Sequence, residues 1–403
     1  MKSKFIVIFT AVASLFVLAA ASSQCRATYV LTETINQPDP TQFNALRGVL
    51  LTDDYLLISA RAFSTPGKLG RMLLYDAAGE QLLHTFQDPL YYGFQALDFA
   101  SSASVDGRHL AAASRSDLPA LVHVFDTSSG ELRRTITSPI AAHPGFGSGG
   151  AQVVGDYIVV GTEAFRVGAT GPSYPASIDI FDANTGDLLR TLIRPSDAFG
   201  WGGQISVSGN TIAVGSDRPD DGKVFFYDVR TGSQLGTLQN SLVSNFSSMK
   251  FQDDKVLLGQ TRGSAFLLDT SGNILQTFPS PGVDPQVSGA YFEFCGPNIL
   301  VGSFGSLAAG TTVAPEARLY DSVSGQLLQT FGDFAPGDRI FSMDSNRSGS
   351  EIAILRATYP SFGVQVLVYS VPEPSTQLLA LASLCVSMLR SSRRASRSFY
   401  LPR

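Results

Sequence analysis

The stretch FGWGGQISVSGNTIAVGSDRPDDGKVFFYDVRTGSQLGTL, residues Phe199–Leu238, carries the clearest structural signal in the chain. It contains four runs of β-forming residues, GQISVS, TIAVGS, KVFFYD and SQLGTL. The runs are joined by SGN, DRPDDG and VRTG, which are rich in the residues that tight turns require. The stretch therefore predicts a four-stranded antiparallel sheet built from consecutive hairpins.

The same unit recurs along the chain. The second run has seven copies, namely YLLISA (55–60), HLAAAS (109–114), YIVVGT (157–162), TIAVGS (211–216), KVLLGQ (255–260), NILVGS (298–303) and EIAILR (351–356). Six of the third runs, such as RMLLYD and SIDIFD, lead through a glycine turn into a fourth run, such as EQLLHTF or DLLRTL. The seventh third run, VQVLVYS, ends at Ser370 with no fourth run after it.

The missing run lies at the other end of the chain, where YVLTETI (Tyr29–Ile35) matches the fourth-run type and has no preceding partner. One threonine marks each fourth run, at Thr34, Thr85, Thr135, Thr191, Thr237, Thr277 and Thr330, with spacings of 40 to 56 residues. That period is typical of propeller blades. The sequence predicts an all-β fold over residues 28–370, a seven-bladed β-propeller that the N-terminal strand closes.

Segments such as FGWGGQISVSGNTIAVGS followed by GKVFFYD resemble the FG-GAP and quinoprotein-like families of β-propellers. In FG-GAP propellers of the integrin type, calcium sits in loops with alternating aspartates. The nearest equivalent here is DRPDDG, with Asp217, Asp220 and Asp221, which lacks that alternation and occurs in one blade. A solvated turn is the preferred interpretation, and no metal site is predicted.

Residues 1–27 have the organisation of a secretory signal peptide. Lys2 and Lys4 precede the apolar run FIVIFTAVASLFVLAAA, and small residues follow before Cys25-Arg26-Ala27. Cys25 raises the alternative of a lipoprotein, but SSQC lacks the residues expected before a lipidated cysteine. We therefore expect export through the Sec translocon.

Residues 371–403 begin with VPEPS, continue with the apolar run TQLLALASLCVSML (376–389) and end in an arginine cluster. Together with a signal peptide, this combination resembles the PEP-CTERM sorting signal of Gram-negative bacteria. The resemblance implies that Pro372, Glu373 and Pro374 are the motif that an exosortase-type enzyme processes. It also implies transient anchoring in the inner membrane, with Arg390, Arg393 and Arg394 as the cytoplasmic stop. The apolar helix is short, about 21 Å against a hydrocarbon core of about 30 Å.

Charge limits the kinds of partner. Of 29 Lys and Arg residues, three lie in the leader and five in the tail, which leaves 21 against 33 acidic residues for residues 28–370. A net charge near −12 argues against nucleic acid, and we expect neutral or cationic partners. No catalytic constellation emerges, because the four histidines are scattered and GSGG (147–150) is not followed by Lys.

The loops between the second and third runs and between blades are the variable ones, and they emerge at the same end of the ring. Recognition sites favour such loops, so the candidate ligand-binding residues are Tyr91, Tyr92, Phe165 and Tyr174. The alternative for each is packing between blades.

The predicted function is that of an exported surface or extracellular-matrix protein without a cofactor, serving as a non-catalytic binding or structural module. An extracellular polysaccharide or another protein is the expected kind of ligand. The alternative is an exported quinoprotein-like or hydrolytic enzyme. Quinoprotein dehydrogenases resemble one another in tryptophan-rich docking motifs, and this chain has one tryptophan, Trp201.

Overall fold

The computed structural model describes residues 28–372, apart from the stretches 37–44, 62–69, 88–97, 116–119, 141–142, 167–172, 196–199, 217–221, 241–245, 261–262, 280–289, 304–305, 309–310, 333 and 359–362. The predicted signal peptide and most of the predicted sorting tail therefore lie outside the described residues. Among the described residues no helix is long and apolar enough to cross a membrane.

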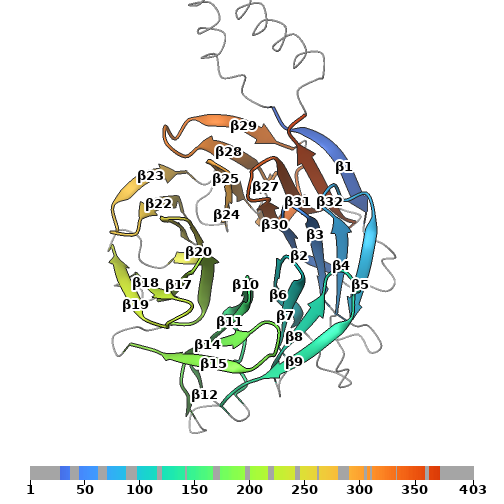
Figure 1. Ribbon diagram of the computed structural model, residues 1–403. Helices are drawn as coiled ribbons and strands as arrows, with labels where there is room; N and C mark the ends of the chain where they lie inside the picture. The colour runs from blue at the N-terminus through green and yellow to red at the C-terminus, as the bar shows by residue number, and fades with distance from the viewer. Residues whose placement is uncertain are drawn as a thin grey trace, which may run out of the picture. The chain divides into compact units, whose positions relative to one another are not determined.

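Seven four-stranded antiparallel sheets form the blades of a β-propeller, as the sequence predicts (Figure 1). Blade 1 consists of β2(Ala45–Leu51), β3(Tyr55–Arg61), β4(Arg71–Asp76) and β5(Leu82–Gln87). Blade 2 consists of β6(Asp98–Asp106), β7(His109–Arg115), β8(Leu121–Asp126) and β9(Leu132–Thr137). Blade 3 consists of β10(Gly150–Val154), β11(Tyr157–Thr162), β14(Ser177–Asp182) and β15(Leu188–Ile193). Blade 4 consists of β16(Gln204–Ser208), β17(Thr211–Ser216), β18(Lys223–Asp228) and β19(Gln234–Gln239). Blade 5 consists of β20(Phe246–Gln252), β21(Lys255–Gln260), β22(Ala265–Asp269) and β23(Ile274–Phe278). Blade 6 is β24(Ala290–Cys295), β25(Asn298–Ser303), β28(Ala317–Asp321) and β29(Leu327–Phe331).

Blade 7 combines the two ends of the propeller. Its strands are β30(Arg339–Ser345), β31(Glu351–Ala357), β32(Val364–Ser370) and the N-terminal β1(Val30–Asn36), which lies beside β32. The Thr32 hydroxyl donates to the Val368 carbonyl at 3.1 Å. The ring closure predicted from the unmatched YVLTETI run is confirmed, with the strand shifted by one residue.

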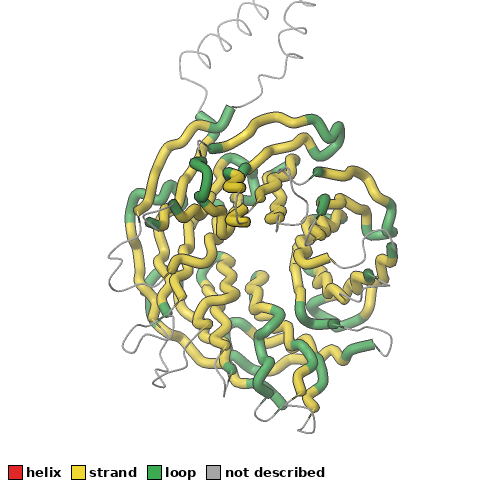
Figure 2. The backbone as a smooth tube through the Cα atoms, turned by 180° about the vertical axis from the view of Figure 1, so that it is seen from behind, coloured by secondary structure: helices red, strands yellow, loops and turns green. Residues whose placement is uncertain are grey.

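The first strands of the blades, such as β2, β6 and β10, lie nearest the centre of the ring (Figure 1). First strands of neighbouring blades contact each other all around the ring, which Figure 2 shows from behind. The second and third strands are buried on both faces because they lie between blades. Their apolar residues form clusters shared by adjacent sheets, such as the cluster that joins Val159 and Ile178 of blade 3 to Ile212 and Val214 of blade 4. This explains why the second runs are continuously apolar.

Trp201, in the motif FGWGG, is fully buried in that same cluster. Gly202 follows it with a φ of +91°, and a Cβ atom there would lie 2.6 Å from the Thr162 carbonyl oxygen. The glycines of this motif thus let the backbone of blade 4 approach blade 3 closely while Trp201 fills the space between them.

An aspartate ends the third strand in each of blades 1 to 6 and caps the turn that follows. Asp228 accepts hydrogen bonds from Thr231 N at 2.7 Å and Thr231 Oγ1 at 2.9 Å. The turn is completed by a glycine in the left-handed region, Gly232 in this blade. The repeated aspartates are therefore turn caps.

Candidate functional site

The candidate site is the axial channel, which encloses about 810 Å³. First strands of all seven blades line it, together with the turns that lead to the second strands. The first strands are edge strands whose backbone N–H groups have no further strand to pair with. Their hydrogen-bonding needs shape the wall of the channel.

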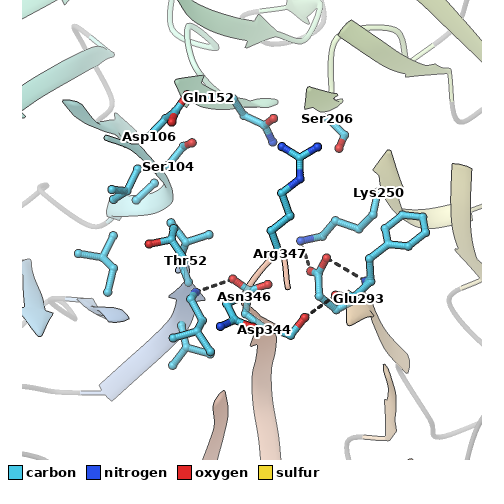
Figure 3. Close-up of a pocket in the computed structure, with 18 of the residues that line it drawn as sticks. Thr52, Ser104, Asp106, Gln152, Ser206, Lys250, Glu293, Asp344, Asn346 and Arg347 are labelled. Carbon is cyan, nitrogen blue, oxygen red and sulfur yellow. Dashed lines mark hydrogen bonds and ion pairs between the residues drawn. The ribbon is translucent and has the colours of Figure 1, made fainter. Parts of the chain in front are cut away.

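One position per blade faces the neighbouring blade at the same level of the channel. In blades 1 to 6 it stands five residues before the first residue of the second strand, and in blade 7, where the turn is longer, it stands seven residues before it. We call these seven residues the inner ring: Leu50, Ser104, Gln152, Ser206, Lys250, Glu293 and Asp344. Six of them are drawn around the opening in Figure 3.

Four inner-ring side chains accept a hydrogen bond from the backbone of the next blade. The donors are Val153 N to Ser104 Oγ at 3.1 Å, Val207 N to Gln152 Oε1 at 2.8 Å, Phe251 N to Ser206 Oγ at 2.9 Å and Leu51 N to Asp344 Oδ2 at 2.7 Å. Each donor stands one residue beyond the inner-ring position of its own strand. Polar side chains thus satisfy the edge strands near the axis, where apolar packing would leave the N–H groups unpaired.

Blades 5, 6 and 7 place charged residues on the inner ring, and we call Lys250, Glu293 and Asp344 the charged arc. The Lys250 ammonium forms an ion pair with the Glu293 carboxylate, and the Glu293 and Asp344 carboxyl groups contact each other. Glu293 and Asp344 are 8% and 6% exposed. Two buried carboxyl groups therefore share one ammonium group.

This arrangement raises the pKa values of Asp344 and Lys250. Desolvation and the neighbouring Glu293 charge raise the pKa of Asp344 well above its usual value. Desolvation alone would lower the pKa of Lys250, but its attraction to Glu293 and Asp344 outweighs that effect and raises the pKa. Lys250 is consequently a cation held by two acids.

Arg347 lies at the mouth of the channel, in the turn between β30 and β31. Its guanidinium pairs with Asp253 of blade 5 at 3.2 Å, so it spans the part of the mouth that belongs to blade 6. Both side chains are about two-thirds exposed, at 69% and 65%. An exposed pair of this kind contributes little free energy and opens readily.

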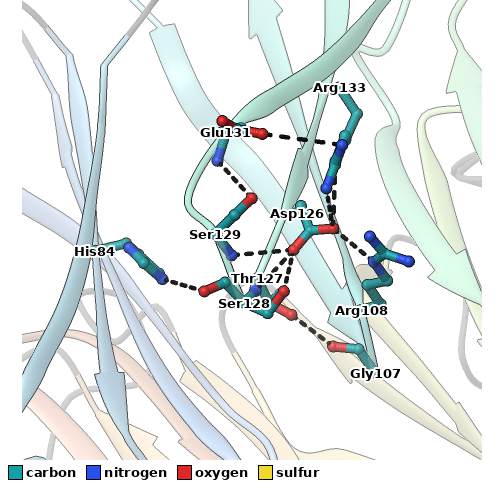
Figure 4. A network of polar contacts seen from close by, with 9 residues as sticks. All are labelled: His84, Gly107, Arg108, Asp126, Thr127, Ser128, Ser129, Glu131 and Arg133. Atoms are coloured by element: carbon teal, nitrogen blue, oxygen red, sulfur yellow. Dashed lines mark hydrogen bonds and ion pairs between the residues drawn. The ribbon is translucent and has the colours of Figure 1, made fainter.

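A second polar network surrounds Asp126 at the end of β8 (Figure 4). Its carboxylate accepts from Arg108 Nε at 2.6 Å, Arg133 Nη2 at 2.9 Å and Ser129 N at 3.1 Å, and its side chain is 1% exposed. The hydrogen bond from Ser128 and those from the two arginines hold the pKa of Asp126 far below its usual range. The network is a reinforced turn cap with every acceptor engaged.

Of the residues predicted from sequence to bind a ligand, the structure brings two together. Phe165 and Tyr174 lie opposite each other in the hairpin of β12(Phe165–Arg166) and β13(Ser173–Tyr174). Phe165 is 38% exposed, whereas the Tyr174 ring packs against His143 with centroids 5.0 Å apart. This hairpin extends the connection between the second and third strands of blade 3, so it belongs to the end of the ring away from Arg347.

The remaining predicted residues lie outside the described part of the chain, namely Tyr91, Tyr92, Asp217, Asp220, Asp221, Glu373, Pro374, Arg390, Arg393 and Arg394. Pro372 is described and is exposed two residues after β32. Within the described residues, no group of three or more His, Cys, Asp or Glu side chains is arranged to hold a metal ion.

Sequence reasoning missed the charged arc. In six blades the inner-ring residue stands five positions before the second strand, so aligning the repeats on their second runs would have placed Lys250 and Glu293 with Ser104 and Ser206. Asp344 stands seven positions before β31, because the turn in blade 7 is two residues longer. It would have been missed even in that alignment.

The chain matches no known protein-family profile and no curated protein. Among solved structures it is similar to the β-propeller domain of Cps50 (Swd1) of Myceliophteria thermophila, with a TM-score of 0.55, 12% identity and coverage of 86% of this chain and 100% of that one. It is also similar to the Dos1 propeller (TM-score 0.54, 13% identity, coverage 87% and 96%). A third similar structure is hydrazine synthase of Kuenenia stuttgartiensis (TM-score 0.55, 14% identity, coverage 83% and 99%). At such identities the likeness shows the propeller fold alone.

Proposed function

We propose that the protein is an exported propeller, sorted and processed through its C-terminal PEP motif, that acts at the cell surface or in the extracellular matrix as a non-catalytic binding module. The observation that carries the binding role is the charged arc. The arc occupies three adjacent positions of the inner ring. At other positions of the inner ring, the uncharged Ser104 and Ser206 accept the hydrogen bond from the next blade. Such a departure from the internal repeat is a mark of function.

The closure of the ring supports the sorting role. The last strand of the propeller, β32, is paired on both sides and ends at Ser370, one residue before the VPEPS segment. All seven four-stranded sheets of the propeller are therefore complete at Ser370, before the VPEPS segment begins, which is compatible with removal of the residues that follow. Pro372 is exposed, as a processing site requires.

The sorting role is tested by replacing Pro372, Glu373 and Pro374 with alanine in the full-length chain, expressed in its native host. The matched control replaces Ser375 and Thr376 with alanine. We expect the PEP variant to stay in the membrane fraction, while the control and the unaltered protein are released. Release of the PEP variant to the same extent as the control would refute the sorting role.

One observation favours the alternative of an exported enzyme. Burial and the neighbouring Glu293 carboxylate raise the pKa of Asp344 well above its usual value, and acid–base catalysis uses carboxyl groups in such surroundings. A bound chromophore, seen as absorbance beyond that of Trp201 and the tyrosines in the purified protein, would favour a quinoprotein-like enzyme. A spectrum without one, together with reversible ligand retention, favours the binding module.

A further inference from the structure

The contacts between neighbouring blades do not require the charges of the arc. Ser104 and Ser206 occupy the same inner-ring position and bond the next blade through a hydroxyl group. Burying a charged group carries a desolvation penalty even when the group is paired. Serine at Lys250, Glu293 and Asp344 would avoid that cost, so the arc has another task.

The channel has the size and the wall of a ligand site. Its volume of about 810 Å³ lies in the range of small-molecule pockets, roughly 300 to 1,000 Å³. Lys250 lines the channel with a side chain that is 40% exposed, and its ammonium group has three N–H donors, which is more than the ion pair with Glu293 requires. Ser104 and Ser206 accept from the backbone through their oxygens, which leaves their O–H groups available as donors.

The complementary ligand must donate and accept hydrogen bonds at once without bringing a charge. An anion would meet Glu293 and Asp344, and a cation would compete with Lys250 for them. A hydroxyl group accepts from Lys250 or Ser206 and donates to a carboxylate lone pair while the ion pair stays intact. We propose that the channel binds a neutral polyhydroxylated molecule of the sugar or polyol class through Lys250, Glu293 and Asp344 of the charged arc, together with Ser206 beside the arc and Ser104 of blade 2.

The mouth of the channel adds selectivity. Asp53 and Asp54 in the blade 1 turn, and Asp253 and Asp254 in the blade 5 turn, lie at the end where Arg347 crosses. Asp106 of the blade 2 turn adds a fifth acidic group at this end, and Arg347 and Lys255 compensate two of the five charges. The net negative field repels acidic ligands, so a neutral sugar is favoured over the corresponding uronic acid.

This inference gives the ligand class of the proposed binding module and rests on that binding role, but it is independent of export and tail processing. The test uses the purified full-length chain and saturation-transfer NMR with glucose, galactose, mannose, N-acetylglucosamine and their disaccharides as probes, with glucuronic acid as the acidic counterpart. We expect saturation transfer to at least one neutral sugar and at least tenfold weaker binding of glucuronic acid. No transfer to any neutral probe at millimolar concentration, or preference for the acid, would overturn the proposal.

The structure supplies its own control variant. The triple change Lys250→Ser, Glu293→Ser and Asp344→Ser gives blades 5 to 7 the residue that blades 2 and 4 already use. It should keep or raise the melting temperature and weaken sugar binding at least tenfold, whereas Glu131→Gln on the exposed rim should change neither. If the triple variant does not fold, the near-isosteric Glu293→Gln is used, and the same loss is expected. Unchanged affinity in a folded arc variant contradicts the proposal even when the tail is processed as proposed.

Discussion

The carboxylate of Asp344 accepts a hydrogen bond from the backbone N–H of Leu51 at 2.7 Å, joining the last blade to the first across 293 residues of sequence. The same carboxyl group contacts Glu293 on its other side. Asp344 therefore belongs both to the closure of the ring and to the charged arc.

The first prediction concerns the pH dependence of stability. Because the folded-state pKa of Asp344 is raised, its favourable contribution is complete below the unfolded pKa of about 3.9 and is lost as the pH rises through the folded value. Asp344→Asn keeps an acceptor for Leu51 N–H and removes the titration. We expect the variant to melt higher than the unaltered protein at pH 7 to 8, and the gap to narrow toward pH 4.

Thermal unfolding by circular dichroism across this pH range measures the effect. Asp254→Asn removes the same charge from an exposed turn and should follow the unaltered protein. If the melting temperatures of Asp344→Asn and of the unaltered protein differ by the same amount at every pH, Asp344 does not titrate as described.

The second prediction concerns ring closure. Ile35 of β1 is 8% exposed and packs in a cluster with Leu56 of blade 1 and Val368 of blade 7. Ile35→Ala should lower the free energy of unfolding by about 2 to 4 kcal/mol, measured by urea unfolding. Val30→Ala, at a position 44% exposed, serves as the control and should cost well under half as much.

Deleting residues 29–35 is the stronger form of the same test. The deletion uncovers the edge of β32 and the apolar cluster around Val368, so the product should aggregate. A soluble truncation that melts cooperatively is incompatible with closure of blade 7 by the N-terminal strand.

The sequence was sufficient for the architecture because seven apolar second runs and six aspartate-capped turns repeat at blade spacing. The unmatched run at Tyr29 and the unmatched strand ending at Ser370 together predicted the closure. The charged arc was not found in this way, since Lys250, Glu293 and Asp344 sit on weakly patterned first strands, and the longer turn of blade 7 places Asp344 two positions out of register with the other two. Only the curvature of the ring brings them together.

The motif FGWGG gives a third prediction. Gly202→Ala would place a Cβ atom 2.6 Å from the Thr162 carbonyl oxygen at a φ of +91°, and we expect it to cost about 2 kcal/mol or more. Gly236→Ala in β19 has no atom within 4 Å of the new Cβ and should be neutral or slightly stabilising. Equal unfolding midpoints for the two variants in urea would rule out close approach of blades 3 and 4 at this glycine.

The fourth prediction compares two turn caps. Asp126→Ala removes hydrogen bonds from Arg108, Arg133 and Ser129 and should lower the free energy of unfolding by about 2 to 3 kcal/mol, whereas Asp228→Ala at an ordinary cap should lower it clearly less. Since the pKa of Asp126 is lowered in the folded state, its contribution is present above pH 4 and is lost as the pH falls through the folded value. Urea unfolding at pH 7 checks the ranking, and equal costs would mean that the arginines contribute nothing.

The measurement that tests the central claim most directly is the intact mass of the mature protein isolated from its native host. The account predicts a chain that has lost the leader near residue 27 and the tail near Glu373, so that the propeller, residues 28–370, is retained. A mature chain that still begins at Met1 or still ends at Arg403 would contradict it.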